Sequence, residues 1–239
     1  LGINNAKDPE LVIDAISKAD LVTTAIGPNI LPYIAELVAK GIMERQASGN
    51  KEPLDILACE NMIGGSQFLY EEVKKYLTPE GIEFTKELIG FPNAAVDRIV
   101  PAQHHEDPLF VIVEPFNEWV VETSRMKNPD LRLEGVHYEK NLEPFIERKL
   151  FSVNSGHATS AYTGAHFGAK TILEALQNPT VKTKVESVLT EIRNLLIAKW
   201  GFDDEIARMR PVELLGKPRK RAERRCSKTS EGCTKAGAL

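Results

Sequence analysis

The stretch Asp20-Leu-Val-Thr-Thr-Ala-Ile-Gly-Pro28 is a short apolar, β-branched run that ends at a Gly-Pro pair. Such runs favour strands and a Gly-Pro pair ends them, so we predict a strand followed by a loop. Apolar residues at helical spacing lie on both sides of this run, over Asp8 to Ala19 before it and Ile30 to Lys40 after it. The pattern predicts helix, strand, loop and helix.

The same order recurs further along the chain. Leu54-Asp-Ile-Leu-Ala-Cys59 predicts a second strand, Glu60-Asn-Met-Ile-Gly-Gly65 a polar loop, and Ser66 to Tyr76 a helix. Two such units in succession indicate a parallel sheet covered by helices. Ligands gather at the carboxyl ends of such strands, which makes the loops Thr23 to Asn29 and Glu60 to Gly65 candidate binding sites.

The remaining strand signals lie between Leu109 and Glu122. Leu109 to Pro115 and Glu118 to Glu122 predict two further strands, which we expect to close the same sheet. Strand signals stop at Asn141, and Leu142 to Leu176 and Val181 to Trp200 predict long helices. We therefore expect an α/β domain followed by an all-helical one.

Composition and charge exclude several classes of protein. The 239 residues carry a net charge of −4, but the segment from Pro211 onward has eight Lys/Arg and three Glu, which leaves −9 for residues 1–210. This excess of negative charge over residues 1–210 argues against nucleic-acid binding. The chain contains no apolar run near the roughly 20 residues that span a bilayer, so we expect no membrane association. Its three scattered cysteines indicate a reducing, cytoplasmic setting.

The stretch Lys149-Leu-Phe-Ser-Val-Asn-Ser-Gly-His157 combines three residue types that suit alcohol oxidation. On an α-helix, Lys149, Asn154 and His157 point at roughly 0°, 140° and 80°, within one broad face. A partly buried lysine serves as a general base near neutral pH, and amide or imidazole donors hold a reacting oxygen. Taken singly, each residue more often has only solvent or local hydrogen bonds.

This stretch resembles the signature Lys-x4-Asn-x2-His of the polyol-specific long-chain dehydrogenases. Three further stretches extend the resemblance over about residues 1 to 205, namely Cys59-Glu-Asn-Met-Ile-Gly-Gly65, Phe91-Pro-Asn-Ala-Ala-Val-Asp-Arg-Ile-Val-Pro101 and Glu114-Pro-Phe-Asn-Glu-Trp-Val-Val-Glu122. The residues around Asn154 and His157 are similar to the branch that acts on mannitol 1-phosphate.

The resemblance implies a small-molecule reaction, in which D-mannitol 1-phosphate and D-fructose 6-phosphate are interconverted by hydride transfer with NAD. It implies that Lys149 is the general base and that Asn61 and Asn154 donate to the reacting oxygen. It also implies that His157 orients the substrate and that Asp97 supports the pocket. No metal is required, and we expect a monomer.

The resemblance also implies a cofactor loop, with Thr23, Ala25, Ile26, Gly27 and Asn61 in contact with NAD. Several of these residues have simpler interpretations. The loop residues could form an ordinary strand-ending turn, and Asn61 could cap the following helix.

Two further alternatives concern charged and metal-binding side chains. Asp97 could form an ion pair with Arg98. His104 and His105, near Glu106 and Asp107, raise a metal alternative, which the polar segment disfavours.

The resemblance implies a fold class as well, the C-terminal part of a Rossmann-like parallel or mixed sheet domain followed by an all-helical domain. We expect residues 1–140 to form a partial dinucleotide-binding domain, 141–210 a helical substrate domain, and 211–239 a basic, divergent, disordered tail. The chain has no Gly-x-Gly-x-x-Gly turn, so we expect it to be N-terminally incomplete. The competing hypotheses are another polyol or uronate dehydrogenase and a non-catalytic, decayed fragment.

Overall fold

The computed structural model describes residues 2–98, 100, 103–107 and 109–202. The described residues form two compact units, of which the first ends at Leu142 and the second begins at Glu143. The basic tail predicted over residues 211–239 lies outside the described residues.

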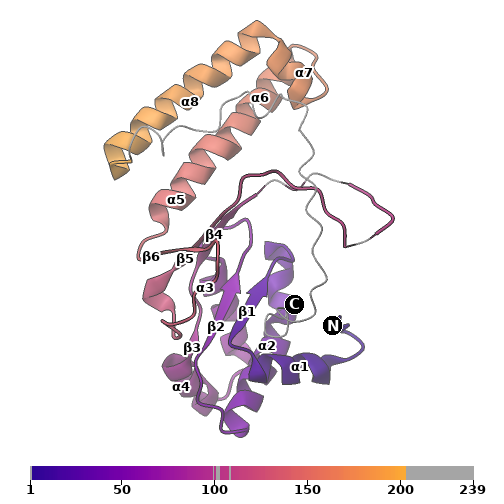
Figure 1. Cartoon of the computed structure of the whole chain (residues 1–239), viewed down its shortest axis with the longest axis vertical. Helices are drawn as coiled ribbons and strands as arrows, with labels where there is room; N and C mark the ends of the chain where they lie inside the picture. Colours follow the sequence, from indigo (N-terminus) through magenta and orange to yellow (C-terminus); the bar gives the residue numbers. More distant parts are fainter. Residues whose placement is uncertain (1, 99, 101–102, 108, 203–239) are drawn as a thin grey trace. The chain divides into compact units, whose positions relative to one another are not determined.

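A three-stranded parallel sheet lies at the centre of the first unit (Figure 1). Its strands are β1 (Leu21–Thr24), β2 (Leu54–Ala58) and β3 (Ile89–Gly90), in the order β1-β2-β3. β1 and β2 are aligned so that Thr24 lies opposite Ala58, and their carboxyl ends therefore meet at one edge of the sheet. Both predicted strands and their parallel pairing are confirmed.

Helices precede and follow these strands. They are α1 (Pro9–Lys18), the short 3-10 turn η1 (Pro28–Ile30), α2 (Leu31–Ala47), α3 (Gly65–Val73), the 3-10 turn η2 (Lys74–Tyr76) and α4 (Pro79–Leu88). The helices predicted before β1, after β1 and after β2 are confirmed, although α2 continues seven residues beyond Lys40, to Ala47. We did not predict α4 or β3.

Alternation of side chains along β1 and β2 gives the first sheet two buried faces. Val22, Ile56 and Ala58 belong to a core shared with the helices. On the opposite face, Leu21 and Leu57 pack with residues of a second sheet. Layers therefore cover both faces of the first sheet, as expected for a buried parallel sheet.

The second sheet contains β4 (Ala94–Asp97), β5 (Glu118–Glu122) and β6 (His137–Glu139). β5 lies in the middle, antiparallel to β4 and parallel to β6. The predicted strand at Glu118 to Glu122 is confirmed, but the prediction that it closes the first sheet was wrong.

The strand predicted over Leu109 to Pro115 was also wrong, since residues 109–115 form no strand. The side chain of Gln103 explains part of this result. Its amide oxygen accepts from the backbone N–H of Ile112 at 2.6 Å and its amide nitrogen donates to the Ile112 carbonyl at 2.8 Å. A side chain therefore satisfies the backbone groups that a neighbouring strand would otherwise bind.

The second unit is helical. It contains α5 (Glu143–Arg148), the π-helical segment η4 (Lys149–Asn154), α6 (Ser155–His166), α7 (Ile172–Gln177) and α8 (Pro179–Trp200). The helix predicted over Val181 to Trp200 is confirmed by α8. The single helix predicted over Leu142 to Leu176 was wrong, because the helix ends at His166 and α7 begins at Ile172.

Local chemistry explains this interruption. Gly168 has a φ of +78°, a left-handed conformation that ends helices. Thr171 is the N-cap of α7, and its side-chain oxygen accepts from the backbone N–H of Glu174 at 3.1 Å. The carboxylate of Glu174 accepts in return from the N–H of Lys170 at 2.8 Å. Ala175, Leu176, Val181 and Val185 form the buried core that holds α7 and α8 together.

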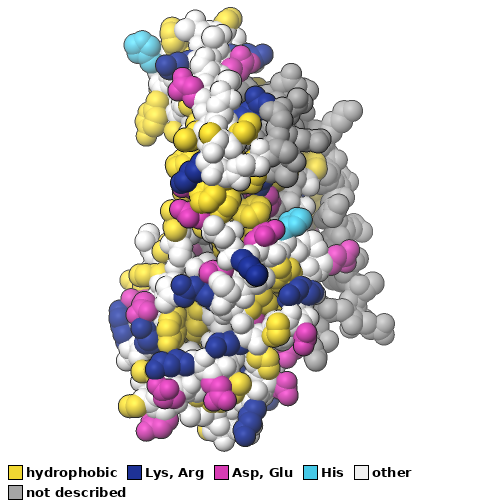
Figure 2. Space-filling view, turned by 90° about the vertical axis from the view of Figure 1, so that its left-hand side faces the viewer, with side chains coloured by type: hydrophobic (Ala, Val, Ile, Leu, Met, Phe, Trp, Pro, Cys, Tyr) yellow, Lys and Arg dark blue, Asp and Glu magenta, His cyan; other side chains and the backbone are white. Residues whose placement is uncertain are grey.

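Exposed faces of the helices carry ion pairs at one-turn spacing. Lys18 pairs with Asp14 at 2.5 Å, and Lys40 with Glu36 at 2.7 Å. Figure 2 shows basic and acidic side chains interspersed over the face that it presents. Each exposed pair stabilises its helix only slightly. None of the described helices is long and apolar enough to cross a lipid bilayer.

Candidate functional site

The end of β1 and the loop after it contain four of the five predicted cofactor residues. Thr23 and Thr24 end the strand, Ala25 is exposed, and Ile26 and Gly27 are half-buried. Gly27 has a φ of +95°, which L-residues rarely adopt, and a Cβ at Gly27 would have no atom within 4 Å. The loop therefore turns sharply and leaves open space beside its backbone.

A buried carboxylate holds this loop in place. One oxygen of Glu60 accepts from the Thr24 hydroxyl at 2.9 Å and from the Ile26 N–H at 3.0 Å, and the other accepts from the Gly27 N–H at 2.8 Å. Glu60 is only 8% exposed. Hydrogen bonds to an ionised carboxylate are stronger than neutral ones. Glu60 therefore ties the loop after β1 to the end of β2.

Ser66 holds the two ends of the loop after β2 together. The buried Ser66 hydroxyl accepts from the backbone N–H of Ala58 at 2.8 Å, which joins the first turn of α3 to the last residue of β2. Asn61 lies between them and is exposed. The alternative that Asn61 caps the helix was wrong, because the N-cap of α3 is Gly64.

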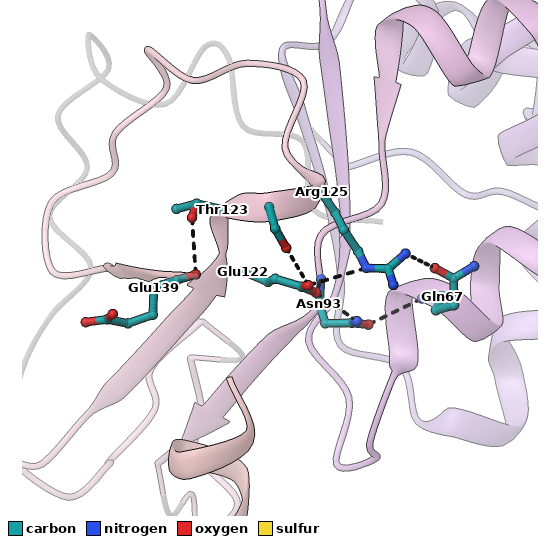
Figure 3. A network of polar contacts seen from close by, with 7 residues as sticks. Gln67, Asn93, Glu122, Thr123, Arg125 and Glu139 are labelled. Atoms are coloured by element: carbon teal, nitrogen blue, oxygen red, sulfur yellow. Dashed lines mark hydrogen bonds and ion pairs between the residues drawn. The ribbon is translucent and has the colours of Figure 1, made fainter. Parts of the chain in front are cut away.

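A polar network on the surface of the first unit fixes α3 to the second sheet (Figure 3). Arg125 donates to the side-chain oxygen of Gln67 at 2.6 Å and lies 3.4 Å from the carboxylate of Glu122. Asn93 donates to the same carboxylate at 3.0 Å and accepts from the Gln67 N–H at 3.4 Å. The beginning of α3 is thus held from the side of β5 as well as from β2.

Asp97 is the last residue of β4 and is buried, 8% exposed. It lies opposite Glu118 in the antiparallel pair with β5. Arg98, the next residue, is exposed. The first unit therefore holds a buried carboxyl group at the end of β4, within the stretch Phe91 to Pro101 that carries part of the family resemblance.

Lys149, Asn154 and His157 lie in the second unit and are all half-buried. The assumption of a regular α-helix through these residues was wrong, because Lys149–Asn154 is π-helical. In this segment a carbonyl pairs with the N–H five residues on, as the N–H of Ser155 does with the carbonyl of Leu150. The directions of Lys149 and Asn154 around the helix axis are therefore closer together than in a regular α-helix.

The Cys59 thiol and the imidazole of His105 are further groups of the described residues with thiol or metal-binding chemistry. Burial and the neighbouring negative charge of Glu60 raise the pKa of the Cys59 thiol to about 12. His105 is hydrogen-bonded to Gln103 at 2.8 Å. No group of three or more His, Cys, Asp or Glu residues in the described part of the chain has the arrangement that holds a metal ion.

Glu60 is the residue that the sequence analysis did not single out. It was included only as the first residue of a candidate loop. The signal available was an acidic residue two positions after a buried strand. The loop after the neighbouring strand contains a glycine. A carboxylate in that position reaches the N–H groups that the turn leaves without helical or strand partners.

Two family comparisons cover nearly all of the described chain. Residues 1–135 match the mannitol dehydrogenase Rossmann domain, and residues 141–209 match the mannitol dehydrogenase C-terminal domain. The chain belongs to the mannitol dehydrogenase family. The resemblance to polyol-specific dehydrogenases is thereby confirmed, as are the Rossmann-type sheet and the helical part that follows it.

Curated relatives are close in sequence over part of their length. Proteins named mannitol-1-phosphate 5-dehydrogenase from Streptococcus pneumoniae strains Hungary19A-6 and TIGR4 are each 76% identical over 202 residues. The match covers 84% of this chain and 53% of each relative. The chain thus spans about half the length of the curated relatives it matches.

Solved structures share the fold at low sequence identity. The ternary complex of Pseudomonas fluorescens mannitol 2-dehydrogenase with NAD and D-mannitol matches with a TM-score of 0.68 at 18% identity, over 84% of this chain and 50% of the other. A substrate-free D-sorbitol dehydrogenase matches with a TM-score of 0.67 at 19% identity, over 78% of this chain and 47% of the other.

Proposed function

We propose that the enzyme containing this chain is an NAD-dependent oxidoreductase that interconverts D-mannitol 1-phosphate and D-fructose 6-phosphate. The observation that carries the proposal is the half-buried set Lys149, Asn154 and His157, in a chain 76% identical to relatives named for this reaction. The scarcity of cysteine supports a cytoplasmic setting. We also propose that the enzyme is a monomer.

The proposed chemistry assigns one role to each side chain. Lys149 removes the proton from the substrate hydroxyl as the general base. Asn61 and Asn154 donate hydrogen bonds to the oxygen on which negative charge develops. His157 orients the substrate, and Asp97 supports the pocket. When bound, NAD supplies the hydride acceptor, and no metal is required.

The π-helical turn supports the shared action of Lys149 and Asn154. A regular α-helix would separate their directions by roughly 140°. A π turn brings residues five apart onto one side, and such turns occur often at functional sites. The base and one oxygen donor therefore come from successive turns of the same helix.

The residues of the first unit are compatible with a dinucleotide. We propose that Thr23, Ala25, Ile26, Gly27 and Asn61 hold NAD. All five lie at the carboxyl ends of the parallel strands β1 and β2, where ligands of such sheets bind. The open space beside Gly27 supports the close approach of a ligand to the backbone.

Initial rates with a panel of substrates test this function. A complete protein is made by placing residues 1–202 of this chain within the matching part of a Streptococcus pneumoniae relative. We expect NAD-dependent oxidation of mannitol 1-phosphate to exceed that of mannitol, sorbitol and uronates by at least 10²-fold in kcat/KM, since a pocket built for a charged group rejects analogues lacking it. Preference for a free polyol, or for NADP, would contradict the proposal, and absence of any turnover would favour a non-catalytic role.

A further inference from the structure

The carboxylate of Glu60 occupies the backbone N–H groups at the turn of the cofactor loop. Both of its oxygens are engaged, and its donors are the Thr24 hydroxyl and the N–H groups of Ile26 and Gly27, at 2.8–3.0 Å. An ionised carboxylate only accepts hydrogen bonds, and so matches three donors. These N–H groups are therefore already bonded to an anion of the protein itself.

This arrangement limits what the loop can bind. Successive backbone N–H groups at a turn form a concave site for anions such as phosphate. Here the carboxylate of Glu60 takes the place of such an anion, and it adds a negative charge directly beneath the loop. That charge repels a pyrophosphate and attracts a cationic or hydrogen-donating group.

A second observation supports an electrostatic effect of this charge on its surroundings. The charge of Glu60 is a cause, after burial, of the raised pKa of the adjacent Cys59 thiol. Because Glu60 is 8% exposed, solvent screens its charge only weakly. A ligand that reaches the loop therefore experiences the same negative potential.

We propose that Glu60 is a positioning residue that fits the loop after β1 to the nicotinamide ribose end of the cofactor and keeps the pyrophosphate away from it. The inference rests on the proposed function, because it requires that NAD binds at this edge of the sheet. The oxidised nicotinamide ring carries a positive charge and the reduced ring does not. Glu60 should therefore favour NAD⁺ over NADH.

Calorimetric titration of the complete protein with three ligands tests this proposal. NAD⁺ carries the charged ring, NADH the neutral ring, and ADP-ribose keeps the pyrophosphate but lacks nicotinamide. In Glu60→Gln we expect NAD⁺ to bind about tenfold more weakly, as expected for the loss of one nearby charge. NADH should weaken less than NAD⁺, and ADP-ribose should change by less than about twofold.

Glu52→Gln is the matched control, because it removes the same charge from an exposed residue of the loop before β2. It should leave all three affinities unchanged. Equal weakening of all three ligands in Glu60→Gln would mean that Glu60 only maintains the fold, and a selective loss of ADP-ribose would place the pyrophosphate at this loop. Either result would overturn the proposal.

Two further measurements keep the proposal testable. If Glu60→Gln does not fold, Thr24→Val removes one donor to the carboxylate but keeps its charge and its two backbone bonds. The preference for NAD⁺ over NADH should then stay as in the unmodified protein, and loss of that preference would overturn the proposal. If the unmodified protein binds neither NAD⁺ nor NADH, the proposed function itself fails. Normal binding of all three ligands by Glu60→Gln, without selective weakening of NAD⁺, rejects only the role of Glu60.

Discussion

The backbone N–H of Ser155 donates to the carbonyl of Leu150, five residues earlier. In an α-helix the same N–H would pair with Phe151. The wider turn brings the direction of Asn154 around the helix axis closer to that of Lys149 than an α-helix would. The hydroxyl of Ser155 also donates to the Leu150 carbonyl, at 3.2 Å, which strengthens the wide turn at its end.

Asn154 and Asn61 should both act as donors to the reacting oxygen. We expect Asn154→Ala, and separately Asn61→Ala, to lower kcat of the complete enzyme in both directions by a factor that corresponds to about 2–4 kcal/mol per donor. Steady-state kinetics measures this effect. A variant with unchanged kcat and a raised KM for the substrate would show that the amide binds a remote group of the substrate instead.

Arg45 should be a main support of the first unit. It is 1% exposed, and its guanidinium donates to the carbonyls of Ser17 and Ala19 at 2.8 and 2.9 Å and to that of Glu52 at 2.8 Å. Burial lowers the pKa of Arg45, which therefore depends on these acceptors. Arg45→Met should reduce the free energy of unfolding by about 3 kcal/mol, because buried carbonyls lose a charged donor.

Urea denaturation measures this change, with Lys40→Met as the control. Lys40 is an exposed residue of the same helix, α2, and its loss should change the free energy of unfolding by less than about 0.5 kcal/mol. Equal effects of the two substitutions would mean that the Arg45 contacts contribute little to stability.

Cys59 should react slowly with alkylating reagents while the protein is folded. Its pKa is raised to about 12, first by burial and then by the charge of Glu60. Because the folded pKa is above the ordinary value, the thiol stays protonated through the range in which the thiol of the unfolded chain ionises. Iodoacetamide labelling followed by mass spectrometry should show a native rate that still rises near pH 10.

The same labelling distinguishes the two causes of the shift. Glu60→Gln should lower the pKa of Cys59 only in part, because burial remains. A native labelling profile with a midpoint near 9, the ordinary thiol value, would contradict both causes.

The sequence predicted the strands whose positions depend on neighbouring residues in the chain. Val22 and Ile56 lie in short, mainly apolar runs that end at a Gly-Pro pair or a polar loop, and both strands form where they were expected. Pairing between distant segments could not be predicted in the same way. β5 was placed in the wrong sheet because its partners, β4 and β6, are short and have weak patterns.

Contacts and conformations in the candidate site were also difficult to predict from the sequence. The spacing of Lys149 and Asn154 suggested a shared role, but the angle between their side chains was calculated for an α-helix. The segment is π-helical, and a π turn has no simple sequence signature. Glu60 was missed because its partners, Ile26 and Gly27, lie more than 30 residues earlier. Contacts between backbone N–H groups and a distant carboxylate leave no periodic pattern in the sequence.

The turnover of Lys149→Met with NAD and mannitol 1-phosphate tests the central claim most directly. A positioned general base contributes about 10²–10⁴-fold, so the variant of the complete enzyme should be slower than the unmodified enzyme by at least about 10²-fold in the chemical step. Lys184→Met, at an exposed lysine of α8, should retain normal turnover. Near-normal single-turnover rates for Lys149→Met from neutral to alkaline pH would contradict the account and remove Lys149 from the reaction.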